Sequence, residues 1–271
     1  MDTSKLRRQE FWRSFAPGLR TDGSMLQKCP PLPLPPGAVP EFMRQLREDG
    51  YFQQSADWGV DLELMASTAR ALSQADLPPV FAFLYDQFWY PFVRLRSVYE
   101  GLLGGRYYVL PGCWVWNVDP KKGDSGWAPH RDAGRTALFE DGSPKSVTTW
   151  IPLSAATPLN GCMYIVPASQ DPTYATADEV NWKGKFDYAS IRALPANPGR
   201  LLDLESGGPA LGRQVFAARG RIACEHVFRV PARRRTANPC AVDRTDARAN
   251  LRHAAATRVQ ADPSIPSHVQ A

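Results

Sequence analysis

The chain has 271 residues, 44% of them hydrophobic, which is enough for one domain with a buried core. No apolar stretch approaches the roughly 18 residues of a membrane-spanning helix, and the N-terminus lacks the apolar segment of a secretory signal. Five cysteines without a C-x-x-C pair predict neither a disulfide framework nor a zinc ribbon. We therefore expect a cytoplasmic location, with Cys29, Cys113 and Cys162 as unreactive residues.

The net charge of +5 would suit an anionic partner such as nucleic acid, but the excess is confined to one segment. Residues 1–200 hold equal numbers of acidic and basic side chains, whereas residues 201–271 hold eleven Arg, no Lys and six Asp or Glu. Only two aromatic residues lie in that last segment, against 27 before it. Residues 1–200 show no basic face or base-stacking pattern, so nucleic acid is not expected as a partner. The composition places a boundary near residue 200.

Residues 1–40 form the first predicted unit, an arm that ends in the proline-rich stretch "CPPLPLPPGAVP". Proline lacks the backbone N–H of a helix and favours an extended chain. The stretch is interpreted as a rigid arm packed on the domain, with a ligand for an SH3-type domain as the alternative.

Helices are predicted next, at the start of a second unit over residues 41–200. "EFMRQLREDGY" indicates a short helix that ends at Gly50. "DLELMASTARALSQAD" has apolar residues at helical spacing, namely Leu62, Met65, Ala69 and Leu72. The aromatic-rich stretch from Val80 to Gly105 predicts a helical region interrupted near Pro91.

From residue 106 the hydrophobic period changes to that of strands. "SVTTWIPLSA" puts Thr148 and Trp150 on one face and the following residues on the other: Val147, Thr149, Ile151 and Leu153. Asn160-Gly161 is a hairpin-type turn signal before another short apolar strand. Helices followed by an antiparallel run predict an α+β, mostly β fold, a sheet sandwich backed by N-terminal helices.

A candidate metal site lies in "GWAPHRDAG". In a strand, residues i and i+2 point to the same face, so His130 and Asp132 can converge on one ion while Arg131 points away. Two histidines and a carboxylate on one face of Fe(II) leave positions open for a co-substrate and O2. The alternative for an isolated pair is a hydrogen-bonded His–Asp on a surface turn.

The neighbouring motifs resemble the phytanoyl-CoA dioxygenase family of Fe(II)/2-oxoglutarate oxygenases. The match comprises "WAPHRD", the W-x-P-L strand, the Asn-Gly-Cys turn and the V-P-x-S strand end, in order over roughly residues 40–200. The resemblance implies a double-stranded β-helix (jelly-roll) core, iron held by His130 and Asp132, and 2-oxoglutarate on the same metal. It also implies a pocket for 2-oxoglutarate lined by Trp150, unless Trp150 is a core residue, with Asn117 as a further candidate.

The third part of the site is missing from the sequence. The family pattern calls for a strand that begins Gly-Asp and ends with a distal histidine, followed by an Arg that holds 2-oxoglutarate. Gly199 is present, but Arg200 replaces the acid, and the next histidine is His226. If the segment is a real but unusual tail, His226 is the candidate for the distal metal ligand. Arg229 or one of Arg233–Arg235 would then reach the co-substrate. The jelly roll is therefore expected to be incomplete at its C-terminus.

A shifted reading frame offers an explanation for residues 201–271. Read one base later, the codon of Arg200 can give Asp, and the codons of Ala210 and Leu211 can give His among several residues. The same reading yields "VSMSFEFQR", which alternates with strand period and supplies an Arg. An Arg- and Ala-rich segment without Lys is also typical of GC-rich DNA translated out of frame. The hypothesis is that residues from about 200 onward are a frameshifted translation.

Three functions remain open. The first is a non-haem Fe(II)- and 2-oxoglutarate-dependent dioxygenase, with O2 and a small or lipid-like molecule as substrates. The second is a catalytically dead, frameshifted or truncated family member without a complete iron site. The third is a cupin-like metal hydrolase or isomerase. The sequence identifies neither the substrate nor the oligomeric state.

Overall fold

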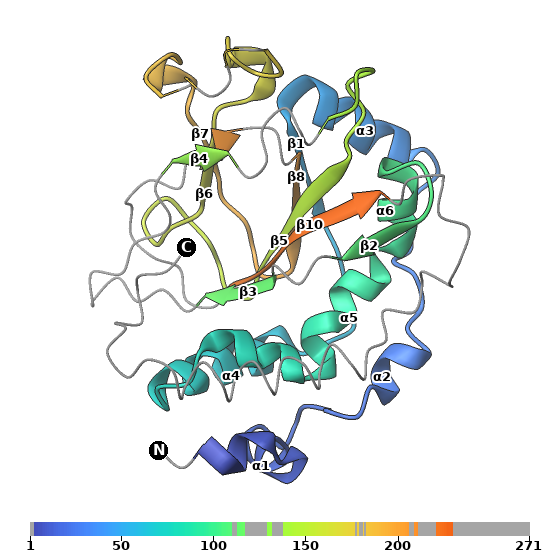
Figure 1. Cartoon of the computed structure of the whole chain (residues 1–271), viewed down its shortest axis with the longest axis vertical. Coiled ribbons are helices and arrows are strands. Elements are labelled where there is room, and N and C mark those ends of the chain that lie inside the picture. The colour runs from blue at the N-terminus through green and yellow to red at the C-terminus, as the bar shows by residue number, and fades with distance from the viewer. Residues whose placement is uncertain are drawn as a thin grey trace.

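The computed structural model describes residues 3–109, 113–116, 129–131, 138–176, 178, 181, 183–205, 209–210 and 221–229. In these residues a layer of helices covers one face of a β-sheet, and a smaller sheet lies on its other side (Figure 1). The α-helices come first in the chain: α1 (Gln9–Phe15), α2 (Ser24–Gln27), α3 (Ala38–Asp49), α4 (Leu62–Gln74), α5 (Asp86–Arg94) and α6 (Arg96–Leu102). Short 3-10 helices include η1 (Thr3–Arg7), η2 (Pro79–Leu84), η5 (Ala168–Gln170) and η7 (Tyr188–Ser190).

The N-terminal arm is packed on the domain, and it contains helices as well as the extended stretch. Trp12 of α1 is fully buried and receives a hydrogen bond on its carbonyl oxygen from the Tyr85 hydroxyl at 2.8 Å. Within the proline-rich stretch, the backbone N–H of Leu32 donates to the carbonyl of Arg94 at 2.8 Å. The stretch is non-helical as far as Pro35, but α3 already begins at Ala38, because the first turn of a helix tolerates Pro40.

The helices at the start of the domain follow local signals, with one correction. α3 ends at Gly50, which takes a left-handed conformation with φ 78°, and the Asp61 side chain caps α4 by accepting from the N–H of Leu64. The break predicted near Pro91 falls instead at Leu95, between α5 and α6. Pro91 lies inside α5, so the helix continues for one more turn beyond the proline.

The larger sheet has the strand order β1-β8-β5-β10-β2, and β3 also pairs with β10. Its strands are β1 (Tyr51–Ser55), β2 (Tyr107–Val109), β3 (Cys113–Trp116), β5 (Ser146–Pro152), β8 (Arg200–Glu205) and β10 (Arg221–Arg229). The described strands of this sheet pair in antiparallel fashion. Two of these strands lie beyond residue 199, so the backbone of the sheet extends past the composition boundary, where the sequence predicts missing strands.

The smaller sheet has the order β4-β9-β6-β7. Its strands are β4 (His130–Arg131), β6 (Met163–Ile165), β7 (Arg192–Leu194) and β9 (Pro209–Ala210). The Asn160-Gly161 turn precedes β6 as predicted, and Gly161 has φ 88°. It does not close a hairpin, because β5 and β6 belong to different sheets and the turn carries the chain from one to the other. Two antiparallel sheets with chain crossovers between them form a jelly-roll arrangement.

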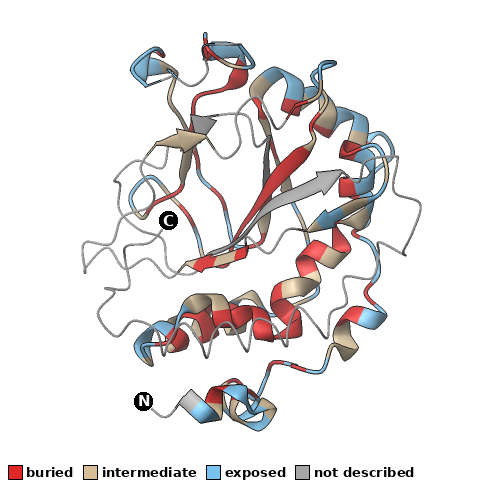
Figure 2. Ribbon diagram, viewed as in Figure 1, coloured by how far each residue is buried: buried red, intermediate tan, exposed pale blue. Residues whose placement is uncertain are grey.

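Two apolar clusters fill the space on either side of the larger sheet (Figure 2). The first lies between the helices and the sheet, and includes Val147 and Ile151 of β5. The second lies between the two sheets, and joins Trp150 to Ile165 and Leu194 of the smaller sheet. β5 is buried on both faces and therefore forms the centre of the molecule.

The cysteines differ in part from the expectation. Cys29 and Cys162 are buried free thiols. Cys113 is disulfide-bonded, and it lies opposite Cys224 in the register of β3 and β10. Directly opposed residues of an antiparallel pair have Cα atoms about 4.5–5.5 Å apart, a separation that a disulfide spans. In the part of the chain that the structure describes, no helix is long and apolar enough to cross a membrane.

Candidate active site

His130 faces the space between the two sheets. It lies on β4 directly opposite Ala210 of β9, and Ala210 lies opposite Ile165 of β6. Directly paired residues of a sheet present their side chains to the same face. Ile165 belongs to the apolar cluster between the sheets, so His130 is on that inner face as well.

Trp150 enters the same space from the larger sheet. Its side chain is 2% exposed and packs in the cluster between the sheets, whereas Val147 and Ile151 of the same strand pack against the helices. The Thr149 hydroxyl, on the helix side, is 2.9 Å from the hydroxyl of Tyr99 in α6. These contacts confirm the alternation predicted for β5.

Arg131 has the opposite orientation from His130 and is held by a buried ion pair. Its Nη2 is 2.5 Å from Oδ2 of Asp171 and 2.7 Å from Oγ1 of Thr173. The side chains of Arg131 and Asp171 are only 6% and 1% exposed. Asp171 follows η5, forty positions along the chain, and no local pattern in the sequence indicates this contact.

The entry into β8 is fixed by a second long-range contact. The indole Nε1 of Trp58 donates to the carbonyl oxygen of Gly199 at 2.6 Å, and the N–H of Gly199 donates to the carbonyl of Pro152 at 2.8 Å. Gly199 has φ +77°, and a Cβ there would lie 2.8 Å from Leu62 Cδ1 and 3.1 Å from Trp58 Cδ1. Gly199, the last residue that follows the family pattern, is thus required at this turn because of its positive φ and its close contacts.

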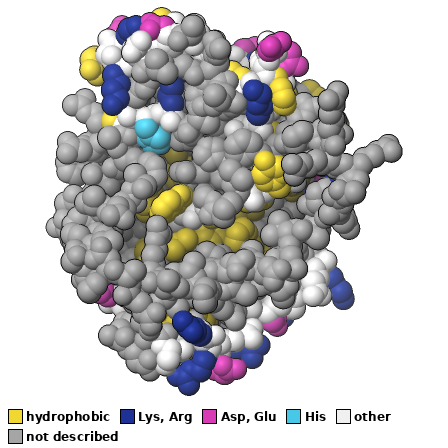
Figure 3. Space-filling view, in the orientation of Figure 1, with side chains coloured by type: hydrophobic (Ala, Val, Ile, Leu, Met, Phe, Trp, Pro, Cys, Tyr) yellow, Lys and Arg dark blue, Asp and Glu magenta, His cyan; other side chains and the backbone are white. Residues whose placement is uncertain are grey.

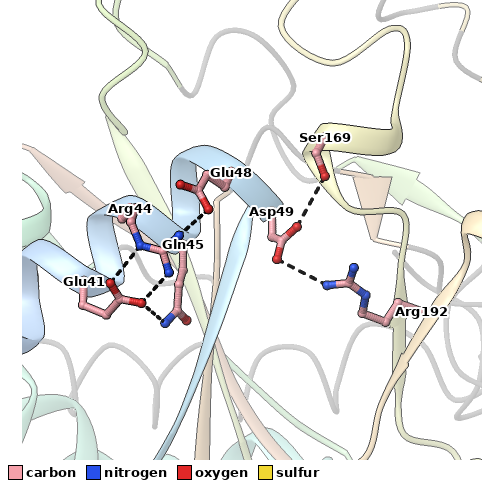
Figure 4. A network of polar contacts seen from close by, with 7 residues as sticks. All are labelled: Glu41, Arg44, Gln45, Glu48, Asp49, Ser169 and Arg192. Atoms are coloured by element: carbon pink, nitrogen blue, oxygen red, sulfur yellow. Dashed lines mark hydrogen bonds and ion pairs between the residues drawn. The ribbon is translucent and has the colours of Figure 1, made fainter.

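A polar network joins the end of α3 to η5 and β7 (Figure 4). Arg192 of β7 donates from Nη1 to the Tyr51 hydroxyl at 2.8 Å and pairs with Asp49 at 3.3 Å. The hydrogen bond to Tyr51 contributes most to raising the pKa of Arg192. The Ser169 hydroxyl reaches Asp49 at 3.4 Å, so the end of α3 is joined to both η5 and β7.

The structure does not describe the side chains of the other predicted site residues. Asp132 and Asn117 lie outside the described residues. For His226 on β10, only the backbone is described. Within the described ranges, no group of three or more His, Cys, Asp or Glu is placed to hold a metal. The position opposite His130, where a further ligand could approach, holds Ala210.

The fold and the inward-facing histidine together define a jelly-roll protein with a candidate metal-binding strand in its smaller sheet. The chain belongs to the phytanoyl-CoA dioxygenase (PhyH) family, whose model matches residues 54–202. The matched range begins inside β1, includes β2 to β7, and ends inside β8. No curated protein sequence matches the chain.

Several solved structures have similar folds. HygX from Streptomyces hygroscopicus, with nickel and 2-oxoglutarate bound, is 14% identical, with a TM-score of 0.52 over 73% of this chain and 94% of that chain. EctD from S. alaskensis with bound Fe is 12% identical, with a TM-score of 0.49 over 74% and 81%. The α-ketoglutarate-dependent epimerase SnoN from nogalamycin biosynthesis is 18% identical, with a TM-score of 0.48 over 76% and 93%. At this identity, the likeness to HygX shows the fold.

Proposed function

We propose that the gene encodes a non-haem Fe(II)- and 2-oxoglutarate-dependent dioxygenase that hydroxylates a small or lipid-like organic molecule. The observation that carries the proposal is the inward position of His130, the first residue of an H-x-D pair, in a member of this family. Iron and 2-oxoglutarate are reported for similar folds, with Fe3+ and α-ketoglutarate in SnoN and 2-oxoglutarate in HygX. The bound metal would supply the oxidation chemistry with O2.

The chain's own residues have separate parts in this proposal. His130 and Asp132 are the metal ligands, and their imidazole and carboxylate suit a first-row ion. Trp150, with Asn117 as a further candidate, lines the 2-oxoglutarate pocket. Its burial between the sheets supports this position but is equally what a core tryptophan would show.

Within the residues that the structure describes, the metal site is incomplete. A facial site needs three protein ligands, and the position paired with His130 is occupied by an alanine, which has no donor atom. The described residues therefore do not fit a stably held iron. The second candidate function, a family member without activity, is favoured by this observation.

The frameshift hypothesis accounts for the same position. The shifted reading can give a histidine, one of four possible residues, from the codons of Ala210 and Leu211, and the register places residue 210 directly opposite His130. Opposed Cα atoms in an antiparallel pair are about 4.5–5.5 Å apart, within reach of two imidazoles that share one ion. This agreement between the codons and the register supports our proposal that residues from about 200 onward are out of frame.

Sequencing the nucleotides over codons 195–215 tests the frame. A one-base change that restores Asp at 200 and His at 210 is expected. If no one-base change in that interval gives a strand with a histidine, the proposal is wrong, and His226 becomes the remaining candidate for the third ligand.

Anaerobic titration of the frame-corrected protein with Fe(II) and 2-oxoglutarate tests the activity. A metal-to-ligand charge-transfer band, followed by succinate formation on adding O2, is expected. Metal-dependent turnover without 2-oxoglutarate would favour a cupin-like hydrolase or isomerase instead. The 271-residue chain itself should show no such band if it is the inactive form.

The proposed substrate is an organic molecule with apolar surface. On the face shown in Figure 3, hydrophobic side chains of the described residues lie in the middle, and charged side chains gather towards the two ends. This distribution supports an organic substrate with apolar surface. A panel of small and lipid-like acceptors, assayed by coupled succinate release, would identify the class.

A further inference from the structure

We infer that the ion pair between Arg131 and Asp171 is a clamp that holds the strand β4, and with it His130, in place. The inference rests on the proposed function for its purpose, because His130 is there a ligand of the metal once the third ligand is restored. Arg131 and Asp171 act through the backbone of β4 and are positioning residues.

β4 needs such a clamp because its own pairing is minimal. The strand has two residues, lies at the edge of the smaller sheet, and pairs with β9, which is equally short. So few backbone hydrogen bonds leave an edge strand free to fray, whereas metal ligation needs a fixed imidazole position. Arg131 is the neighbour of His130 and projects from the other face, so holding its side chain fixes the strand without blocking the inner face.

The partner carboxylate is itself held in place. Oδ1 of Asp171 accepts from the backbone N–H of Thr173 at 2.9 Å and from its hydroxyl at 2.8 Å. Oδ2 is left for Arg131, whose Nη2 also reaches the Thr173 hydroxyl. With both side chains almost fully buried, removing one charge would leave the other without compensation.

The segment that carries Asp171 is anchored to the helical layer. A Cβ on Gly50, at the end of α3, would be in ordinary contact with the Cβ of Ala168 in η5, so the two backbones lie close together. Ser169 reaches Asp49 of α3, as Figure 4 shows. A chain of contacts therefore runs from α3 through η5 and Asp171 to β4, and transfers the rigidity of the helix to the ligand strand.

The test compares Asp171→Asn, Arg131→Lys and the double variant Arg131→Met/Asp171→Leu. The double variant removes both charges together, so it avoids an unpaired buried charge and should fold. Asp86→Asn is the matched control, because Asp86 is also fully buried and accepts backbone hydrogen bonds from Gly23 and Met25 but belongs to α5. Each change is made in the wild-type chain and in an Ala210→His background.

The first measurement is hydrogen exchange of the metal-free protein in the peptide that contains β4. Asp171→Asn and the double variant should exchange about tenfold faster there, as local opening of a released strand requires, whereas Asp86→Asn should not. Arg131→Lys should exchange at a rate between those of the parent and Asp171→Asn, because it keeps the positive charge but the shorter ammonium does not reproduce the guanidinium geometry. Unchanged exchange in the first two variants would overturn the clamp whatever the metal does.

The second measurement is Mn(II) affinity in the Ala210→His background, by calorimetry. Loss of residues that orient metal ligands costs about 10–100-fold in affinity, and this loss is expected for Asp171→Asn but not for Asp86→Asn. Equal affinity in both would overturn the inference. If the Ala210→His parent itself binds no Mn(II), the proposed metal site fails, and the exchange measurement still decides whether the ion pair holds β4.

Discussion

His130 and Ala210 are paired across β4 and β9, so the position next to the first candidate metal ligand carries a methyl group. The strand register therefore identifies position 210 as the place next to His130 where a third metal ligand is missing. It follows that a single substitution can test whether the rest of the site is intact.

Ala210→His is expected to raise the affinity of the chain for Fe(II) or Mn(II) by more than about tenfold, since even a supporting residue contributes about that much. The new imidazole would share the inner face with His130. Isothermal titration of the metal-free protein measures the gain. Leu159→His is the control, because Leu159 is 85% exposed and lies in a turn outside both sheets. An equal gain in both variants would show non-specific binding by added histidine.

Gly199→Ala is expected to lower the free energy of unfolding by about 1–3 kcal/mol. The alanine would have to adopt φ +77°, and its Cβ would press on Trp58 at 3.1 Å. Urea denaturation measures the change. Gly184→Ala is matched in backbone, with φ +76°, but has nothing within 4 Å of the added Cβ. It should lose less stability, and an equal loss in both would mean that packing against Trp58 contributes nothing.

Tyr85 makes the stability of the N-terminal arm sensitive to alkaline pH. Burial raises the pKa of its hydroxyl, which donates to Trp12. The unfolded chain loses this proton above about pH 10 while the folded chain keeps it. Stability from this group is therefore fully present below pH 10 and is lost as the pH rises towards the folded pKa.

Tyr85→Phe should accordingly cost about 1 kcal/mol at neutral pH, through the lost hydrogen bond, and less as the pH increases above 10. Urea denaturation at a series of pH values follows the difference between the two proteins. Tyr188→Phe, at a ring that is 66% exposed, is the control and should change little at any pH. A constant difference for Tyr85→Phe would contradict the assignment.

Trp150→Ala should cost about 3–5 kcal/mol, because it leaves a large cavity between the sheets. Trp150→Phe keeps most of the packing and separates the two roles of the residue. In the Ala210→His background, it should weaken 2-oxoglutarate binding while leaving Mn(II) affinity unchanged, if Trp150 lines the pocket. Unchanged affinity for both ligands would identify Trp150 as a core residue only.

Local patterns were sufficient for several elements of the fold. Gly50 ends α3 and Asp61 caps α4, because both act on hydrogen bonds within their own helix turn. The alternation in β5 separates Trp150 from Ile151, because side-chain direction in a strand depends on the strand alone. Pro91 did not predict the helix end accurately, because α5 continues through the proline and ends before Leu95.

The sequence by itself determined the H-x-D pair, the face of Trp150 and the change in composition near residue 200, because each is a property of neighbouring residues. Only the tertiary structure decided that His130 lies opposite residue 210 and that Arg131 meets Asp171. Strand register and buried ion pairs join residues tens of positions apart, and they are selected by packing of the whole sandwich rather than by local periodicity.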